Sequence, residues 1–298
     1  MSRILLYPVK SCAGIELETA NLTMRGLETL SSRPVRDREY LLVDSFPEKS
    51  TGYHKGLTQR DRGLQKMVLI TPRIRGGKVQ LGWDNQDMIE LPCSDRGKEL
   101  SVRVHLSFAR GIDQGDEVAR LLSDYLQKSV RLVRASPSFP RMAGQNYVKN
   151  DNQLSWQDAY SVNWLFEESV EEVRSMLGRE LSHKNFRPNI VCSGGTPSLE
   201  HSFYHVQFGV VSGIQPKPSS RCMIVNVDYK TGIMPRTMPL TLQVLFDSYN
   251  WKDINKQMQA IFAENFLPSA QGRIEKFSDV FALSWRDPPL VYGKKVAS

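Results

Sequence analysis

The stretches YPVKSC (residues 7–12) and KPSSRC (residues 217–222) lie in opposite halves of the 298-residue chain and carry similar side-chain chemistry. Each joins a basic side chain to a hydroxyl and a thiol. A fold that brings them together places a soft thiolate ligand beside an anion-binding surface, because Lys and Arg bind phosphate groups. A phosphorylated metal cofactor requires that combination. The sequence therefore predicts a site at which the two halves of the chain meet.

The composition is that of an ordinary globular protein, with 40% hydrophobic and 24% charged residues. Its length indicates one large domain or two modest ones. No apolar run approaches the roughly 18 residues needed to cross a bilayer. The apolar stretch Ile4–Pro8 is too short for the core of a secretory signal. We therefore expect a cytoplasmic protein without a membrane partner.

The net charge of +7 favours anionic partners. The basic residues are scattered, and no tract of five Lys or Arg occurs, so we expect no nucleic-acid partner. A basic nucleic-acid-binding barrel remains an alternative, and it would bind oligonucleotides in a strongly salt-dependent manner without a metal.

The first hundred residues contain short strand-like segments separated by Gly and Pro breaks, a pattern typical of a barrel or sandwich. The predicted strands are Arg3–Val9, Glu39–Asp44, Met67–Thr71, Lys78–Leu81, Met88–Leu91 and Leu100–Leu106. Apolar residues at helical spacing from Val118 to Leu126 predict a helix, and Val130–Arg134 a strand. Residues 135–154 lack periodicity and are expected to form a domain boundary or a long functional loop.

The second half mixes helix and strand patterns. We predict helices over Glu167–Leu177, ending near Gly178, and around Leu242 to Tyr249. The predicted strands are Asn189–Cys192, Val206–Val210 and Cys222–Val227, with Arg273–Phe277 and Val280–Trp285 forming a closing hairpin.

Five segments carry a family resemblance in order along the chain. YPVKSCAG (7–14), RDREYLLVD (36–44) and LTQRD (57–61) resemble the N-terminal barrel domain that precedes MOSC domains. NFRPNIVCSG (185–194) and SSRCMIVNVDYKTG (219–232) resemble the MOSC (molybdenum cofactor sulfurase C-terminal) domain itself. The resemblance is closest to the mitochondrial amidoxime-reducing component and its bacterial relatives.

The resemblance implies an α+β, mostly β fold. A β-barrel-like N-terminal domain (1–125) would be followed by a MOSC β-barrel domain with flanking helices (150–293). It also implies a molybdenum–molybdopterin cofactor between them and reduction of N-hydroxylated compounds such as amidoximes and hydroxylamines. No lysine motif for pyridoxal phosphate is present, and no pyridoxal phosphate is expected.

Electrons must come from a separate iron–sulfur, flavin or haem protein, since the chain has no cluster of cysteines. An alternative is a non-catalytic carrier of molybdenum cofactor or sulfur, which would need the same phosphate site and thiol but would not reduce benzamidoxime.

The resemblance also transfers roles to residues. It implies that Cys222, in the SRC motif, binds the metal and is catalytic. The positions that match cofactor-contacting residues are Lys10, Ser11, Arg38, Tyr160, Ser161, Arg187, Ser220, Arg221 and Asn265. These residue types suit the ligand, because Arg offers paired donors to phosphate and Lys a compact charge. An average Lys or Arg is instead a solvated surface charge.

Other candidates have weaker support. Asp158 is a candidate proton donor or substrate-orienting group, although a loop Asp is more often a turn or capping residue. Arg60 lies in a segment that borders the site in relatives. His201 and His205 have a zinc-like spacing but no Glu base between them, so we do not expect a zinc site.

The remaining cysteines suggest packing rather than chemistry. With no CxxC pair, we expect free thiols in a reducing compartment. Cys93 and Cys192 are interpreted as small buried apolar residues. Cys12 lies in the basic motif and stays ambiguous.

Overall fold

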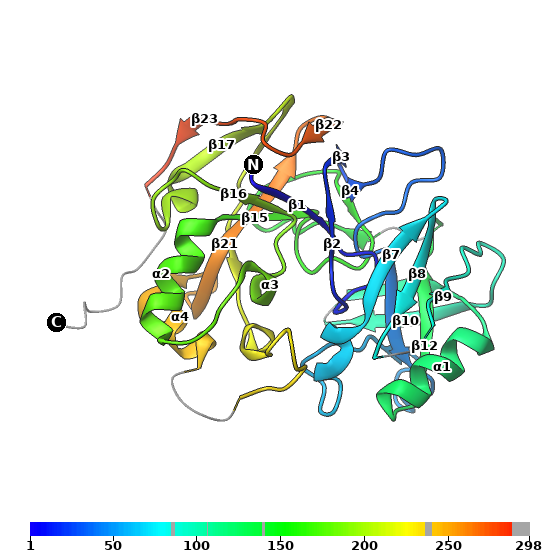
Figure 1. Cartoon of the computed structure of the whole chain (residues 1–298). Helices are drawn as coiled ribbons and strands as arrows, with labels where there is room; N and C mark the ends of the chain where they lie inside the picture. Colours follow the sequence, from blue (N-terminus) through cyan, green and yellow to red (C-terminus); the bar gives the residue numbers. More distant parts are fainter. Residues whose placement is uncertain (85–86, 106, 139–140, 236–239, 288–298) are drawn as a thin grey trace.

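The computed structural model describes the chain except residues 85–86, 106, 139–140, 236–239 and 288–298 (Figure 1). Its largest element is a ten-stranded sheet in which β2-β1-β16-β15-β21-β18-β17-β23 follow one another and β19 and β20 also pair with β21. The strands of this sheet are β1 (Arg3–Leu6), β2 (Ile15–Leu17), β15 (Val162–Phe166), β16 (Ile190–Cys192), β17 (Phe203–Phe208), β18 (Val211–Ile214), β19 (Pro218–Ser220), β20 (Asn250–Lys252), β21 (Met258–Pro268) and β23 (Val280–Trp285).

Smaller sheets complete the molecule. A five-stranded sheet has the order β5-β12-β11-β10-β6, and its strands are β5 (Tyr40–Asp44), β6 (His54–Lys55), β10 (Glu99–Val104), β11 (Ser107–Asp113) and β12 (Val130–Ala135). The other strands are β3 (Thr19–Thr23), β4 (Gly26–Glu28), β7 (Thr71–Arg75), β8 (Lys78–Gly82), β9 (Ile89–Glu90), β13 (Arg141–Met142), β14 (Gln153–Leu154) and β22 (Gly272–Glu275). The predicted mostly β, α+β fold with a barrel-shaped N-terminal sheet is confirmed.

The helices of the described residues are short and flank the sheets. They are α1 (Asp116–Leu126), α2 (Glu167–Leu177), α3 (His183–Phe186) and α4 (Thr241–Ser248), with 3₁₀ turns η1 (Gln65–Leu69), η2 (Leu199–Ser202) and η3 (Met223–Asn226). The three longer helices confirm the sequence predictions, and Gly178 ends α2 in the left-handed conformation. Among these residues, no helix has both the length and the apolar character needed to span a membrane.

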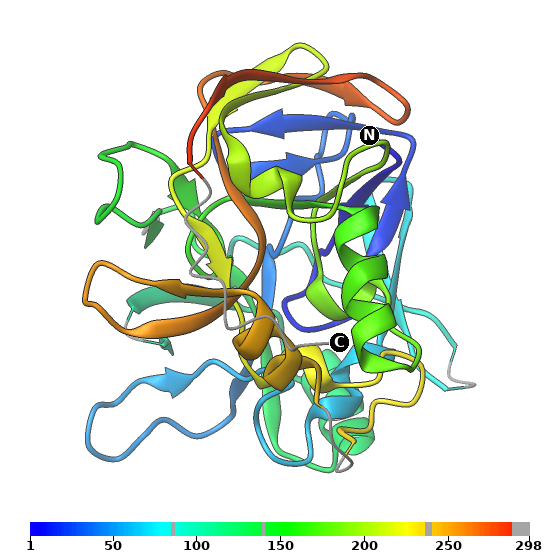
Figure 2. The ribbon, with the colours of Figure 1, turned by 90° about the vertical axis from the view of Figure 1, so that its left-hand side faces the viewer.

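The two halves of the chain are interleaved. Strand β1 pairs with β16, and β22 pairs with β3. The ammonium of Met1 donates a 2.7 Å hydrogen bond to the carbonyl of Ser278. In Figure 2 the first strands, in blue, lie beside the orange and red strands from the end of the described chain. The N-terminal strands therefore belong to the same layers as the strands of the second half.

Some sequence predictions are wrong for reasons of long-range pairing. The predicted strand Cys222–Val227 is instead a 3₁₀ turn. The chain stops pairing with β21 after Arg221, and the Val225 N–H donates to the Cys222 carbonyl. Residues Met67–Thr71 form the end of η1 and the first residue of β7. The closing hairpin does not form, since β22 pairs with β3 and β23 with β17.

Between the halves, residues 135–154 hold the short pair β13 and β14, joined by a polar loop. The Asn150 side chain bonds within that loop to the carbonyls of Gly144 and Val148. Side chain–backbone hydrogen bonds of this kind hold a loop that has no periodic pattern in its sequence.

Candidate functional site

One cavity of about 350 Å³ lies where the two halves meet. All but one of the predicted site residues line it: Lys10, Ser11, Arg38, Asp158, Tyr160, Arg187, Ser220, Arg221, Cys222 and Asn265. The exception is Ser161, which is fully buried and is not part of the lining. Ser161 immediately precedes β15, and its buried hydroxyl has no hydrogen-bond partner among the described residues. The predicted contact of Ser161 with a ligand is thus not favoured by its position.

Three lining residues hold an uncommon backbone conformation. The φ angles of Ser11, Arg38 and Arg187 are 68°, 48° and 56°, in the left-handed region that side-chain-bearing residues seldom adopt. The Arg38 N–H donates to the Tyr7 carbonyl at 2.6 Å, and the Arg187 N–H to the His183 carbonyl at the end of α3. Such strain, held by surrounding hydrogen bonds, is characteristic of binding and catalytic sites. Here it turns both arginine side chains toward one cavity.

The ring of Tyr7 lies between the two guanidinium groups. The Arg38 and Arg187 Cζ atoms are 4.5 Å and 4.4 Å from its centroid. Burial of Tyr7 raises its pKa to about 12, which keeps the phenol neutral. A Cβ at Gly14 would come within 2.6 Å of the ring, so the glycine leaves room for it. The Tyr7 ring therefore stabilises the two guanidinium groups of Arg38 and Arg187 close to each other.

Replacing Tyr7 by leucine is expected to loosen this arginine pair. Each buried cation–π contact is worth about 1–2 kcal/mol, so the variant should hold an anionic ligand roughly tenfold more weakly. The measurement is the amount of the pterin expected from the sequence that is released per mole of purified protein. Tyr7→Phe is the matched control, since it keeps the ring, and it should behave as wild type. Equal pterin in the leucine variant would show that the ring does not position the arginines.

The arginines differ in how many donors remain free. The Arg221 guanidinium donates hydrogen bonds to the carbonyls of Phe186 and Phe262 and to the side chain of Asn163. Arg187 donates from Nη1 to the Cys12 carbonyl at 2.6 Å, while its buried Nη2 has no partner among the described residues. Burial lowers the pKa of both to about 10, which leaves them charged at neutral pH. Of these two arginines, Arg187 thus has the donor group available to bind an anion.

Lys10 and Asp158 form a pair inside the cavity. The Lys10 ammonium donates 2.6 Å hydrogen bonds to Asp158 Oδ1 and to the Trp156 carbonyl. Burial would raise the pKa of Asp158, but Lys10 and His105 outweigh it and lower that pKa well below its ordinary value. Asp158 is therefore a carboxylate at neutral pH, a hydrogen-bond acceptor rather than a proton donor.

Residues 1–129 match the MOSC N-terminal beta barrel domain, and residues 151–257 match the MOSC domain. The chain belongs to the MOSC family. Mitochondrial amidoxime-reducing component 1 of Mus musculus is 30% identical to this MOSC protein over 294 residues, covering 95% of this chain and 82% of the mouse protein.

Two further relatives show similar coverage. Mitochondrial amidoxime-reducing component 1 of Danio rerio is 26% identical over 96% of this chain and 85% of its own. The Homo sapiens protein of the same name is 27% identical over 95% and 82%. A solution structure from Bordetella bronchiseptica covers 35% of this chain at 14% identity with a TM-score of 0.28, too low to bear on the fold.

Within the MOSC segment, Cys222 is half-buried at the rim of the cavity and is the residue before η3. Cys12 and Cys192 are buried, and burial raises the pKa of each thiol to about 12. These two fit a packing role. Cys93 is exposed, so its interpretation as a buried apolar residue is wrong: the chain leaves β9 into a surface loop there. Of the four thiols, Cys222 alone lines the cavity.

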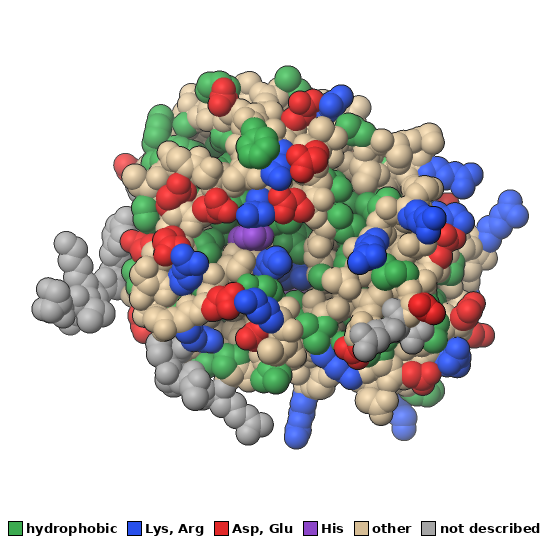
Figure 3. All heavy atoms as spheres, viewed as in Figure 1, with side chains coloured by type: hydrophobic (Ala, Val, Ile, Leu, Met, Phe, Trp, Pro, Cys, Tyr) green, Lys and Arg blue, Asp and Glu red, His purple; other side chains and the backbone are tan. Residues whose placement is uncertain are grey.

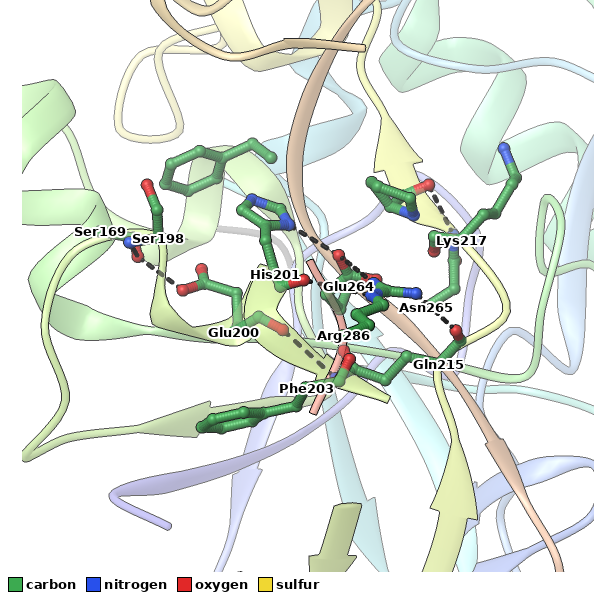
Figure 4. Close-up of polar contacts among 12 residues, drawn as sticks. Ser169, Ser198, Glu200, His201, Phe203, Gln215, Lys217, Glu264, Asn265 and Arg286 are labelled. Carbon is green, nitrogen blue, oxygen red and sulfur yellow. Dashed lines mark hydrogen bonds and ion pairs between the residues drawn. The ribbon is translucent and has the colours of Figure 1, made fainter. Parts of the chain in front are cut away.

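Beneath the MOSC cavity, β21 connects Asn265 to a buried ionic network (Figure 4). The Asn265 side chain donates to the carbonyls of Lys217 and Pro218 and so fixes the segment that leads to Cys222. Its neighbour Glu264 is fully buried, accepts from His201 Nδ1 at 2.6 Å and pairs with Arg286 at 2.9 Å. His201 therefore has a structural partner.

Sequence reasoning missed several lining residues. Asn189 accepts from Arg38 and donates to Asp37, and Gln157 donates to the Asp37 carbonyl. Asn189 lies inside the NFRPNIVCSG motif, and Gln157 directly precedes Asp158, so their positions in the sequence were the available signal. Lys217 opens the second basic stretch, whereas His105 had no sequence signal. Arg60, weighed from the sequence, does line the cavity.

On the face shown in Figure 3, Lys and Arg side chains are interspersed with Asp and Glu rather than gathered into one basic patch. In the cavity, by contrast, six cations share the lining with a single carboxylate, Asp158; they are Lys10, Arg38, Arg60, Arg187, Lys217 and Arg221. This distribution favours a small anionic ligand over a nucleic-acid backbone.

Proposed function

We propose that this protein is a molybdenum-cofactor-dependent oxidoreductase that reduces N-hydroxylated compounds, such as amidoximes and hydroxylamines, with electrons from a separate redox protein. One observation carries the proposal: the half-buried Cys222 lies in a cavity lined by the buried Lys10 and by the half-buried Arg38, Arg187 and Arg221. Family membership supports it, since the relatives are named for the reduction of amidoximes.

The residues present fit the cofactor. Its phosphate needs a buried cation with unused donors, and the Nη2 group of Arg187 lacks a partner among the described residues. We propose that Arg187 and Arg38 hold the phosphate, with Ser11 as a hydroxyl donor. Cys222 would supply the thiolate, because molybdenum favours soft ligands. Lys10, Ser220 and Asn265 would border the pterin.

The overall reaction takes two electrons and two protons and converts R–NHOH to R–NH₂ and water. When bound, the cofactor supplies the two-electron chemistry. The chain supplies position and charge. Arg221, held by three backbone and side-chain acceptors, places a fixed positive charge beside Cys222. Asp158, as a carboxylate, holds the Lys10 ammonium in place.

The proposal also includes the electron donor, the cellular compartment and the domain limits. The electron donor would be an iron–sulfur, flavin or haem protein, and the protein would act in the cytoplasm, whereas the relatives are named as mitochondrial. The domain limits 1–125 and 150–293 belong to the same proposal.

The proposal is tested by elemental analysis of purified protein together with fluorescence of its oxidised pterin. Wild type should carry molybdenum and pterin in similar amounts, and Cys222→Ala should lose most of the molybdenum. Cys93→Ala, which removes an exposed thiol, is the control and should keep it. Equal molybdenum in the Cys222 and Cys93 variants would refute the ligand assignment. Loaded protein that fails to reduce benzamidoxime with a chemical reductant would favour a carrier.

A further inference from the structure

A second cavity of about 320 Å³ shares part of its wall with the first. The residues common to both linings are Asp158, Ala159, Tyr160 and Lys217. The rest of the lining comes mainly from β13 and the loop that follows it, and from the turn between β20 and β21. Most of these side chains are polar or charged, among them Arg141, Asn146, Asp253 and Gln259. The second cavity therefore suits a polar ligand.

Arg141, in β13, is a buried cation of this lining, and its side chain is only partly hydrogen-bonded. The residue is 8% exposed. Its Nη1 donates to the carbonyls of Ser155 and Gln157 at 3.0 Å and 2.8 Å. Its buried Nε–H has no partner among the described residues. A buried donor without an acceptor is destabilising, so an acceptor supplied by a ligand would be bound favourably here.

Two more donors of the same lining have weak partners or none. The Tyr160 hydroxyl is buried and has no partner within the described part of the chain. Burial raises the pKa of Tyr160 to about 12, so the phenol remains a neutral donor. The Lys217 ammonium donates to the Ser220 hydroxyl at 3.5 Å, at the limit of a hydrogen bond. Three donors, two of them cationic, therefore line one cavity.

The two carboxylates of this lining already have donors of their own. Asp158 accepts from the Lys10 ammonium at 2.6 Å and lies 3.2 Å from His105 Nε2. Asp253 accepts from two backbone N–H groups and from one side-chain amide of the segment that joins β20 to β21. The groups left without good partners are thus donors, and the complementary ligand carries an anionic acceptor.

We propose that the second cavity binds a small carboxylate, with the Arg141 Nε, the Tyr160 hydroxyl and the Lys217 ammonium as donors. A carboxylate has two acceptor oxygens and a charge opposite to that of the two cations, and both features match these donors. The site requires neither the cofactor nor Cys222, so this inference goes beyond the proposed function.

Calorimetric titration of benzoate into purified protein tests the proposal, with benzamide as the uncharged analogue of the same size. Wild type should bind benzoate at one saturable site and benzamide at least tenfold more weakly, because the amide lacks the charge. Tyr160→Phe keeps the ring and removes one donor, so the dissociation constant for benzoate should rise roughly tenfold. Lys217→Met should weaken binding in the same direction.

Arg141→Met should have the largest effect on benzoate binding, since it removes both a charge and a donor. Arg141 also holds two backbone carbonyls, so the Tm of this variant is measured alongside. Tyr160→Phe and Lys217→Met leave those bonds in place and keep the proposal testable should Arg141→Met fail to fold.

A matched variant separates the two cavities, because the first also contains cations. Arg187 lines the first cavity and not the second, so Arg187→Met should leave the dissociation constant for benzoate unchanged. Weaker binding in Arg187→Met would place benzoate in the first cavity and overturn the proposal. Equal affinity for benzoate and benzamide, or no binding to wild type, rejects it as well. None of these outcomes alters the molybdenum content, so the two proposals fail independently.

Discussion

Arg187→Met is expected to remove at least nine-tenths of the pterin and molybdenum from the purified protein. Arg187 is the cation of the cavity whose buried Nη2 has no partner among the described residues, so this group remains available to a phosphate. A charge-assisted hydrogen bond is worth about 1.5–3 kcal/mol, and loss of one such bond weakens binding roughly tenfold or more. Pterin fluorescence and elemental analysis per mole of protein measure the effect.

Two variants sharpen this result. Arg187→Lys keeps the charge but loses the paired donors, so it should retain an intermediate amount. Arg60→Met removes an exposed cation of the same cavity and should retain nearly all the pterin. Loss in Arg60→Met together with full retention in Arg187→Met would move the phosphate to the rim of the cavity and contradict the assignment.

Arg286→Met is expected to destabilise the protein strongly. Its guanidinium pairs with Glu264, which is fully buried, and donates to the carbonyls of His201 and Gln215. Removing the cation leaves an uncompensated buried carboxylate, at a cost of about 3–5 kcal/mol. In a chain of this size, that corresponds to a fall in Tm of roughly 10 °C. Calorimetry or circular dichroism checks it.

A second substitution at the Arg286–Glu264 pair should restore part of the lost stability. In the double variant Arg286→Met with Glu264→Gln the buried carboxylate is gone, so part of the lost stability should return. Arg110→Met, which removes a surface ion pair with Glu99, should change Tm by little, because solvent screens exposed pairs. A double variant less stable than Arg286→Met would show that charge compensation does not hold this network together.

The sequence predicted the features that depend on local pattern. The helix α1 followed from apolar spacing, and the end of α2 followed from Gly178, since both depend on neighbours within a few turns. The quoted motifs also identified most of the lining of the cavity, because strand ends such as that of β1 carry the residues that reach it.

Features decided by distant partners were not predictable. The segment after Cys222 has strand-like composition, but it turns because β19 already pairs with β21. The register before β15 decides that Tyr160 lines the cavity while Ser161 is buried, and a shift of one residue would reverse the two. The hydrogen bond from Ile254 N–H to the Tyr147 hydroxyl joins a turn and a loop that are 107 residues apart, which no local pattern connects.

The pairing of β1 with β16 and of β22 with β3 has a consequence for how such chains diversify. The two family matches divide the sequence near residues 130–150, yet β1 of the first match pairs with β16 of the second, and β22, which follows the second match, pairs with β3 of the first. Exchange of one segment between distant relatives would separate strands that evolved to fit each other. Inheritance should therefore keep both segments together, and divergence should accumulate in the loops around the cavities instead.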